Sequence, residues 1–369
     1  MTEYASGLAT TSLANIGYGC QNKIMKIKGR LWILVGDDGL GGMYLLSTLN
    51  YQTFTSTYLG DIGFNKGRGA SMAYDSNADI LHFTWEDGAS TVRYNACTPN
   101  SDGTATLLST ATQRPAGAGS TMSACITLDT DGYPWIIYYK IVLLANELTV
   151  IKSSTKNGIW ITDAAITKIL HTTAADVTYT GGIPVPQTDG KMYFIYTKPY
   201  GDKVYGWQYD PSTGWAVGED TISASNAVGL GIRIDAVADG DDIHMVFEDT
   251  TDKVQYQKFT YGAGWSGETL IEAADTGGVA IALNSITSDL YIHFTSGVSN
   301  ILHRWRYKDS AWSELSTVSL TEPDPDYCGN LRNVGGVNLC IYQGVTSRLV
   351  YFVAYGILSS AVRSVSCGL

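Results

Sequence analysis

The chain has 369 residues, of which 44% are hydrophobic and 16% are charged, and its formal net charge is −11. An acidic surface of this kind repels phosphate backbones, which argues against general nucleic-acid binding. Many glycines (40) and tyrosines (24) with few charges are typical of an all-β protein with many turns, and they argue against helical bundles and disorder.

The N-terminal segment does not read as a targeting sequence. Residues 1–20 have no basic start and no apolar stretch, so they do not form a secretory signal. Nowhere in the chain do apolar residues run long enough for a membrane-spanning helix. We therefore expect synthesis in the cytoplasm without a signal peptide, and no membrane insertion.

An apolar strand that follows an acidic or glycine-containing turn returns seven times along the chain. The second residue of each such strand serves as its anchor: Trp32, His82, Trp135, Tyr193, His244, Tyr291 and Asn338. Successive anchors are 50, 53, 58, 51, 47 and 47 residues apart. A nearly fixed period of this length is the signature of a repeat architecture.

Other columns of residues keep the same period. Twelve residues after the anchor, five units carry an aromatic residue or histidine, namely Tyr44, Tyr94, Tyr205, Tyr256 and His303. Four units have a tryptophan corner further on: Trp160, Trp215, Trp265 and Trp312. Another short strand precedes each anchor, as in SMAYD and GIRIDAV. Each unit therefore offers about four short strands joined by turns.

These repeats predict an all-β, seven-bladed β-propeller with four antiparallel strands per blade, in one domain over residues 21–369. A ring is favoured because a lone sheet would leave its apolar faces in water, whereas neighbouring sheets cover them. Two β-sandwiches are the alternative fold, but they predict no shared register. Residues 161–175 are interpreted as a fourth strand plus a loop. The ring is closed either by residues 356–369, which we slightly favour, or by residues 1–20.

One repeat consists of an acidic turn followed by the motifs I-H-x-V-F-E-D, x-V-x-Y and G-W-S. This order of motifs resembles that of the sialidase-like group of propellers with bacterial-neuraminidase-type repeats. Such repeats often carry an Asp-box, Ser-x-Asp-x-Gly-x-x-Trp, at the corner between the third and fourth strands. Here the corners keep Gly214-Trp215 and Gly264-Trp265, and residues 153–160 (SSTKNGIW) lack the Asp. The resemblance thus implies the fold, and no catalytic residue is carried over from it.

Candidate binding residues lie at the centre of the ring and in the loops that enter the first strands. Counting back eleven and nine residues from the anchors gives mostly small residues, with Arg233 and Asp235 as exceptions. They are candidates for a site in the channel, or for an internal ion pair that fills it. The loops that enter the first strands and join the second to the third strands add Arg68, Arg114, Tyr179, Tyr200 and Tyr327.

No metal or cofactor site is predicted. His82 and His244 share the anchor column with Trp and Tyr, so we expect them to be packing residues. Acidic turns lie at 36–39, 129–132 and 239–242, and their carboxylates could be calcium ligands. Asp and Gly are also the residues that tight turns require, so we interpret these residues as turn formers. The six cysteines are scattered, which favours buried free thiols, with a Cys20–Cys367 disulfide as the alternative.

Three functions follow as hypotheses. The first, which we prefer, is a non-enzymatic propeller that recognises a glycan or a protein receptor, or that is built into a larger particle such as a virion or phage surface. It is preferred because no convergent acid/base set can be identified. The second is a carbohydrate-active enzyme, either a sialidase-like glycoside hydrolase or a polysaccharide lyase. The third is an intracellular protein–protein interaction scaffold, suggested by the apolar run in the link 139–147.

Overall fold

The fold is all-β. The computed structural model describes residues 2–9, 22–37, 42–50, 53–61, 70–87, 91–109, 113, 115, 120–142, 145–160, 166–174, 181–198, 202–227, 233–273, 276–296, 301–319, 328–330, 338–343 and 349–355. Every regular element within these residues is a β-strand. None of these residues forms a helix that is long and apolar enough to cross a membrane. The all-β prediction is confirmed, including a strand at Lys168–Ala174 within the segment 161–175 that we interpreted as a fourth strand plus a loop.

The described strands form seven separate antiparallel sheets, which we number in chain order. Sheet 1 contains β2 (Ile24–Ile27), β3 (Arg30–Asp37), β4 (Gly42–Thr48) and β5 (Thr55–Asp61). Sheet 2 contains β6 (Ser71–Asp75), β7 (Ile80–Glu86), β8 (Val92–Pro99) and β9 (Ala105–Leu107). Sheet 3 contains β10 (Ser120–Leu128), β11 (Pro134–Val142), β12 (Ala145–Lys152) and β13 (Lys168–Ala174).

In the next two sheets the outermost strand is broken into two short pieces. Sheet 4 contains β14 (Gly182–Pro186), β15 (Met192–Thr197), β16 (Val204–Asp210), β17 (Gly214–Trp215) and β18 (Asp220–Thr221). Sheet 5 contains β19 (Ile234–Asp239), β20 (Asp242–Glu248), β21 (Val254–Thr260), β22 (Gly264–Trp265) and β23 (Thr269–Glu272). Sheet 6 again has four strands: β24 (Thr276–Leu283), β25 (Leu290–Ser296), β26 (Ile301–Lys308) and β27 (Ala311–Ser319).

Sheet 7 joins the two ends of the described chain. It contains β28 (Cys328–Asn330), β29 (Asn338–Gln343), β30 (Leu349–Tyr355) and the N-terminal strand β1 (Thr2–Ala9). β1 pairs antiparallel with β30, with Tyr4 opposite Phe352. The N-terminal strand therefore occupies the edge for which we favoured residues 356–369, and that preference is corrected. Those C-terminal residues lie outside the described part of the chain.

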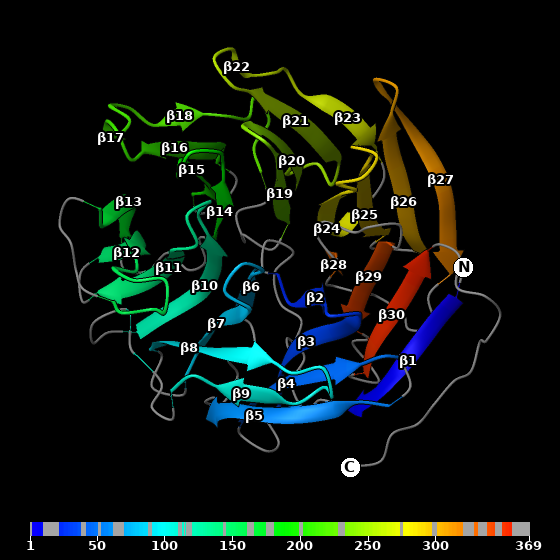
Figure 1. Ribbon diagram of the computed structural model, residues 1–369. Coiled ribbons are helices and arrows are strands. Elements are labelled where there is room, and N and C mark those ends of the chain that lie inside the picture. Colours follow the sequence, from blue (N-terminus) through cyan, green and yellow to red (C-terminus); the bar gives the residue numbers. More distant parts are fainter. Residues whose placement is uncertain are drawn as a thin grey trace.

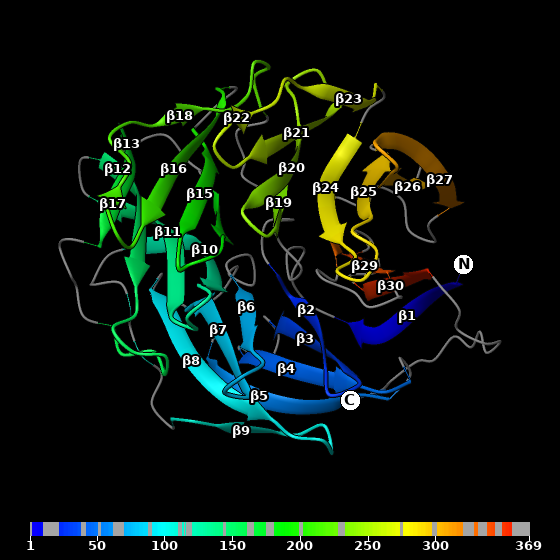
Figure 2. The ribbon, with the colours of Figure 1, turned by 45° about the horizontal axis from the view of Figure 1, so that its top comes forward.

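The sheets stand side by side around a common centre, as in a β-propeller (Figures 1 and 2). The first strands (β2, β6, β10, β14, β19 and β24) lie toward the centre, and outer strands such as β5, β9 and β27 lie on the rim. All seven anchor residues fall on the second strand of their sheet. The predicted spacing of the anchors is thus the spacing of the second strands.

The hydrophobic core lies between neighbouring sheets rather than inside any one of them. One cluster joins Trp32 of sheet 1 to Phe83 of sheet 2, and the next clusters join sheets 2 and 3, 3 and 4, 4 and 5, and 5 and 6. Both faces of the second strands are therefore covered, which explains why a strand such as β15 is buried at every position.

Each tryptophan corner contacts the sheet that precedes it. The ring of Trp160 meets Tyr94 edge-on at 5.1 Å between centroids, and Trp312 meets Tyr256 at 4.9 Å. The indole Nε1 of Trp265 donates a hydrogen bond to the hydroxyl oxygen of Tyr193 (2.9 Å). The Trp column predicted from the sequence thus marks equivalent contacts between successive sheets.

Candidate functional site

A cavity of about 280 Å³ lies where the first strands of the sheets converge. Sheets 2 to 5 each contribute three consecutive residues to its walls: 72–74, 126–128, 184–186 and 236–238. Sheet 1 adds Met25 and, just before β2, Asn22. We call this space the central cavity. Its side-chain lining is mainly Ala, Val, Pro, Met, Ile and Leu, with Asn22, Tyr74 and Thr127 as the polar members.

The central cavity opens toward one face of the ring. Along β19, Ala236 is buried, Ala238 is half-buried, and Asp239 is exposed. On β6, Met72 is buried and Tyr74 is half-buried. In both strands the lining residue nearest the turn that leads to the second strand is more exposed than the lining residue farthest from it. The turns between first and second strands and the turns between third and fourth strands lie on this face of the ring. We call it the turn face.

Backbone groups add hydrogen-bonding capacity to the apolar walls. Each first strand in sheets 1 to 6 pairs only with its second strand, so its other edge faces the centre (Figure 2). Such an edge presents N–H and C=O groups. Two of them bond between neighbouring sheets: the Met72 amide donates to the Asn22 carbonyl oxygen (2.8 Å), and the Ile281 amide donates to Asp235 Oδ2 (2.9 Å).

Two polar side chains of the central cavity each offer a hydrogen-bond acceptor oxygen. The Tyr74 hydroxyl donates its proton to Asp79 Oδ1 (2.8 Å), which leaves the phenol oxygen as an acceptor. Burial, together with the Asp79 carboxylate, raises the pKa of Tyr74 to about 12, so this phenol is neutral at physiological pH. Asn22 Oδ1 is buried and has no hydrogen-bond donor among the described residues.

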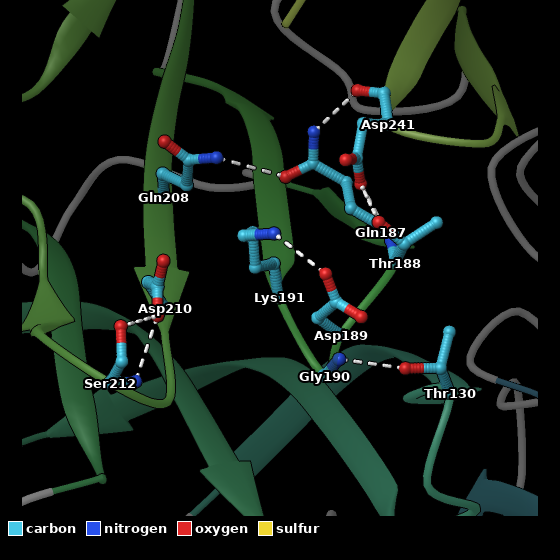
Figure 3. A network of polar contacts seen from close by, with 10 residues as sticks. All are labelled: Thr130, Gln187, Thr188, Asp189, Gly190, Lys191, Gln208, Asp210, Ser212 and Asp241. Atoms are coloured by element: carbon cyan, nitrogen blue, oxygen red, sulfur yellow. Dashed lines mark hydrogen bonds and ion pairs between the residues drawn. The ribbon is translucent and has the colours of Figure 1, made fainter.

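Side chains of the turn face tie neighbouring sheets together (Figure 3). The Gly190 amide donates to Thr130 Oγ1 of the preceding sheet (2.7 Å). The Thr188 amide donates to Asp241 Oδ1 of the following sheet (2.7 Å), and Gln187 Nε2 donates to the backbone oxygen of Asp241 (2.6 Å). The turn of sheet 4 is therefore fixed to both neighbours, and the mouth of the central cavity has a defined frame.

The acidic turns use their carboxylates to shape the turns themselves. Asp129 Oδ1 accepts from the amides of Asp131 (3.1 Å) and Tyr133 (2.8 Å), and its Oδ2 pairs with Lys152 Nζ (2.9 Å). The described residues contain no group of three or more His, Cys, Asp or Glu side chains that could hold a metal ion. The turn at 129–132 thus follows the predicted turn chemistry, and residues 38–39 of the first acidic turn lie outside the described part.

Arg233 and Asp235 are the two predicted site residues that the structure describes. The Arg233 guanidinium pairs with the buried carboxylate of Glu248 and remains partly exposed. Asp235 is fully buried, and its Oδ1 accepts from the Ala236 amide (2.9 Å) while its Oδ2 bonds to Ile281 of the next sheet. Asp235 therefore links sheets 5 and 6 rather than lining the central cavity.

A difference in turn length explains this placement. Two residues separate the paired Asp239 and Asp242 in sheet 5, whereas four separate Asp75 and Ile80 in sheet 2. Counting a fixed number of residues back from the anchor therefore misses the register in sheet 5. Val237, not Asp235, pairs with the anchor His244 and lines the central cavity.

The other predicted contacts, Arg68, Arg114, Tyr179, Tyr200 and Tyr327, lie outside the described residues. Sequence reasoning did not single out Asn22, Tyr74 or Ala238. The residues paired with the anchors would have pointed to them, because Met25, Ala73, Thr127, Val185 and Val237 all line the central cavity.

The apolar link 139–147 is mostly strand. β11 continues to Val142 and β12 begins at Ala145, which pairs with it. The expectation of a link at 139–147 is therefore corrected: its described residues, 139–142 and 145–147, lie in two paired strands. Cys97 and Cys125 are buried thiols outside any disulfide, as expected, and the Cys20–Cys367 alternative lies outside the described residues.

No family model matches the chain, and no curated protein matches it in sequence. Solved structures match it in fold. The WD40 domain of Toxoplasma gondii coronin is 12% identical, with a TM-score of 0.62 over 99% of this chain and 86% of that one. A polysaccharide lyase, the PL25 ulvan lyase bound to -[GlcA(1-4)Rha3S]-, is 10% identical, with a TM-score of 0.62 over 94% of each chain.

The fucose-specific lectin from Aleuria aurantia is 15% identical, with a TM-score of 0.51 over 81% of this chain and 95% of that one. At these identities the likeness shows the fold alone. The chain thus has a β-propeller-like fold similar to those of lectins, WD40 domains and polysaccharide lyases.

Proposed function

We propose that this protein is a seven-bladed β-propeller that recognises carbohydrate, without catalysis, in its central cavity. Each of the seven sheets is one blade in this proposal, and β1 closes the ring as the last strand of the seventh blade. The observation that carries the proposal is the central cavity, which combines apolar walls from five sheets with backbone and side-chain acceptors. Ligand pockets are typically apolar with a few placed polar groups.

The chemistry of a sugar suits these walls. A pyranose ring has faces of C–H groups that pack on apolar side chains, and hydroxyls that need hydrogen-bond partners. Val185 and Ala238 offer the first kind of contact, and Tyr74 and Asn22 offer the second. The similarity in fold to a fucose-specific lectin supports this choice.

The proposal also includes the structural group of the protein, a second binding surface and its biological setting. The Gly-Trp corners support membership of the sialidase-like group. Arg68, Arg114, Tyr179, Tyr200 and Tyr327, from the loops singled out in the sequence, are proposed together with Arg233 as contacts for a second glycan or protein partner. Incorporation into a virion or phage particle is the proposed setting, and it rests on the composition of the chain.

A second candidate, a polysaccharide lyase, is favoured by the extent of the fold match to the ulvan lyase, which covers 94% of each chain. It predicts release of unsaturated uronate ends from glucuronate-containing polysaccharides, measurable by their ultraviolet absorbance. The binding proposal predicts no such release.

A glycan array followed by calorimetry tests the binding proposal. Ala238→Phe places a ring at the half-buried mouth of the central cavity and is expected to abolish binding. Ala263→Phe is the matched control, because Ala263 is an exposed residue in a turn at the outer edge of the same sheet. Binding that survives Ala238→Phe unchanged would place the sugar site elsewhere.

A further inference from the structure

We infer that the central cavity holds one uncharged sugar unit at the end of a glycan chain, an inference that rests on the proposed carbohydrate recognition. The cavity volume of about 280 Å³ lies just below the range of about 300–1,000 Å³ that is usual for pockets of drug-sized ligands. In sheets 2 to 5 the lining residues of each first strand span about 7 Å between the outermost Cα atoms. A single pyranose ring with its substituents matches this space, whereas a chain of several rings exceeds it.

The central cavity is closed at the end away from the turn face. In sheets 2 to 5 the residues one or two positions before the lining residues are at most 1% exposed: Ala70, Ala124, Ile183 and Ile234. Contacts between neighbouring sheets accompany this packing. Ser71 Oγ lies 3.7 Å from Cys125 Sγ, and the Ile281 amide bonds to Asp235 (2.9 Å). No open channel therefore runs along these described residues, and a ligand enters and leaves at the turn face.

The turns around the mouth are bonded to one another. The turn of sheet 4 reaches sheet 3 through Gly190 and Thr130 (2.7 Å), and sheet 5 through Thr188 and Asp241 (2.7 Å) (Figure 3). A terminal sugar unit has one glycosidic linkage to lead out of the mouth, whereas an internal unit has two, at different positions of its ring. Since the reducing end of a surface glycan is attached to its carrier, the free end that enters is the non-reducing one.

The walls of the central cavity carry no charge. None of the described lining residues has a side chain that is charged at neutral pH, because the pKa of the Tyr74 phenol is raised to about 12. A carboxylate, sulfate or ammonium group that entered between such walls would lose its hydration without gaining a counter-charge. The unit that enters is therefore uncharged, and terminal uronates, sulfated sugars and amino sugars are disfavoured.

The polarity of the walls changes with depth. The innermost lining residues are apolar and buried: Met72, Ile126, Pro184 and Ala236. Tyr74 and Thr127 lie nearer the mouth and are half-buried. The Thr127 hydroxyl makes no hydrogen bond within the described part of the chain, so it can both donate to a ligand and accept from it. The C–H groups of the end unit therefore face inward, and its hydroxyls lie near the mouth.

Calorimetry with matched sugars tests this inference. The single-unit probes are the methyl glycosides of glucose, galactose, mannose, fucose, N-acetylglucosamine and glucuronate, together with the terminal unit of any array hit. For the unit that binds best, one oligosaccharide carries it at the non-reducing end, and a second is the same chain capped there by a further sugar. We expect the single unit to bind within about tenfold of the uncapped chain, and the cap or a carboxylate to weaken binding by at least about tenfold.

The outcomes separate this inference from the proposed function. Equal affinity for the capped and uncapped chains, or glucuronate binding as tight as that of the neutral units, would overturn the inference while the proposed function stands. Binding of the uncapped chain without binding of its single end unit would do the same. Absence of any sugar binding would instead overturn the proposed function.

Thr127→Val, which removes one hydroxyl near the mouth, locates the end unit. Because the contacts come from one unit, we expect the single unit and the uncapped chain to lose affinity by the same factor, about three- to tenfold. Thr269→Val is the matched control, because Thr269 is exposed on the outer strand β23. Thermal unfolding checks that each variant is folded. Unchanged affinity of Thr127→Val for the single unit would refute the inference.

Discussion

The Nδ1 atom of His244 lies 2.6 Å from the hydroxyl oxygen of Tyr256, and the pair His82–Tyr94 repeats this contact at 2.7 Å in sheet 2. In both sheets the histidine is the anchor of the second strand, and the tyrosine lies twelve residues later on the third strand. Both imidazoles are buried. Burial disfavours the imidazolium ion and lowers the pKa of each histidine to about 4.

We predict that the free energy of unfolding falls as the pH is lowered from about 6.5 to about 4. In this window the histidines of the unfolded chain bind protons, whereas those of the folded chain do not. Because the unfolded state then holds more protons, acidification destabilises the fold. The loss is on the order of 3 kcal/mol per histidine at the acidic end, and these residues have no effect above neutral pH.

Urea unfolding of the wild type and of H82Q/H244Q, at about pH 7.5 and about pH 4.5, measures this effect. The variant removes both titrations and should lose much less stability between the two pH values. Asp249 does not confuse the comparison, because its pKa is lowered below the ordinary 3.8, so its stabilisation is lost only at still lower pH. An equal loss in both proteins would contradict the prediction.

The repeat could be found from the sequence because the second strands are the most buried part of each sheet. Trp32, Trp135 and Tyr193 are fully buried between sheets, so their positions tolerate only large apolar or packing residues. The period of these buried positions therefore stays recognisable in the sequence, although the loops between them differ in length. The same reasoning found the tryptophan corners, since each must reach the preceding sheet.

The site was harder to predict, because it depends on turn length and not on periodicity. A turn that is two residues shorter moved Asp235 out of the column that lines the central cavity and into a contact with Ile281. Ring closure could not be predicted from a local sequence pattern either. The strand Thr2–Ala9 pairs with residues more than three hundred positions away, and no turn signal announces such a contact.

Loss of the Tyr193 hydroxyl should weaken the contact between sheets 4 and 5. This hydroxyl donates to Asp220 Oδ2 (2.5 Å) and accepts from Trp265 Nε1 (2.9 Å). Tyr193→Phe leaves both partners without that bond, and we expect a loss of about 1–2 kcal/mol in the free energy of unfolding. Tyr261→Phe, at an exposed tyrosine of sheet 5, is the control and should change stability by less than about 0.5 kcal/mol. Equal effects would show that the hydroxyl contact is not used.

Asp235 is predicted to be a structural link between sheets 5 and 6. In Asp235→Asn, one carboxylate oxygen becomes an NH₂ group, so one of the two amide donors, Ala236 or Ile281, loses its acceptor. We expect a loss of about 1–3 kcal/mol, because a buried donor would stay unsatisfied. Asp239→Asn, at the exposed end of the same strand, should leave urea unfolding unchanged. Unchanged stability of Asp235→Asn would refute the assigned role.

Gly206 on β16 is predicted to be required for the packing of the Tyr193 ring. A Cβ atom at Gly206 would lie 2.4 Å from Tyr193 Cε1 and 2.9 Å from Cζ. The ring cannot move away easily, because Phe259 and Trp265 of the next sheet contact it, with centroids at 5.1 and 5.7 Å. Gly206→Ala should therefore cost about 1–3 kcal/mol through overpacking.

The matched control for this variant is Gly218→Ala in the same sheet, where an added Cβ meets nothing within 4 Å. Because alanine also restricts the unfolded chain, that variant should be neutral or stabilised by a few tenths of a kcal/mol. Urea unfolding of the two variants separates the steric effect from the general effect of replacing glycine. If Gly206→Ala were as stable as Gly218→Ala, the close approach of Tyr193 to the β16 backbone would be refuted, and with it the tight packing of sheet 4 on sheet 5.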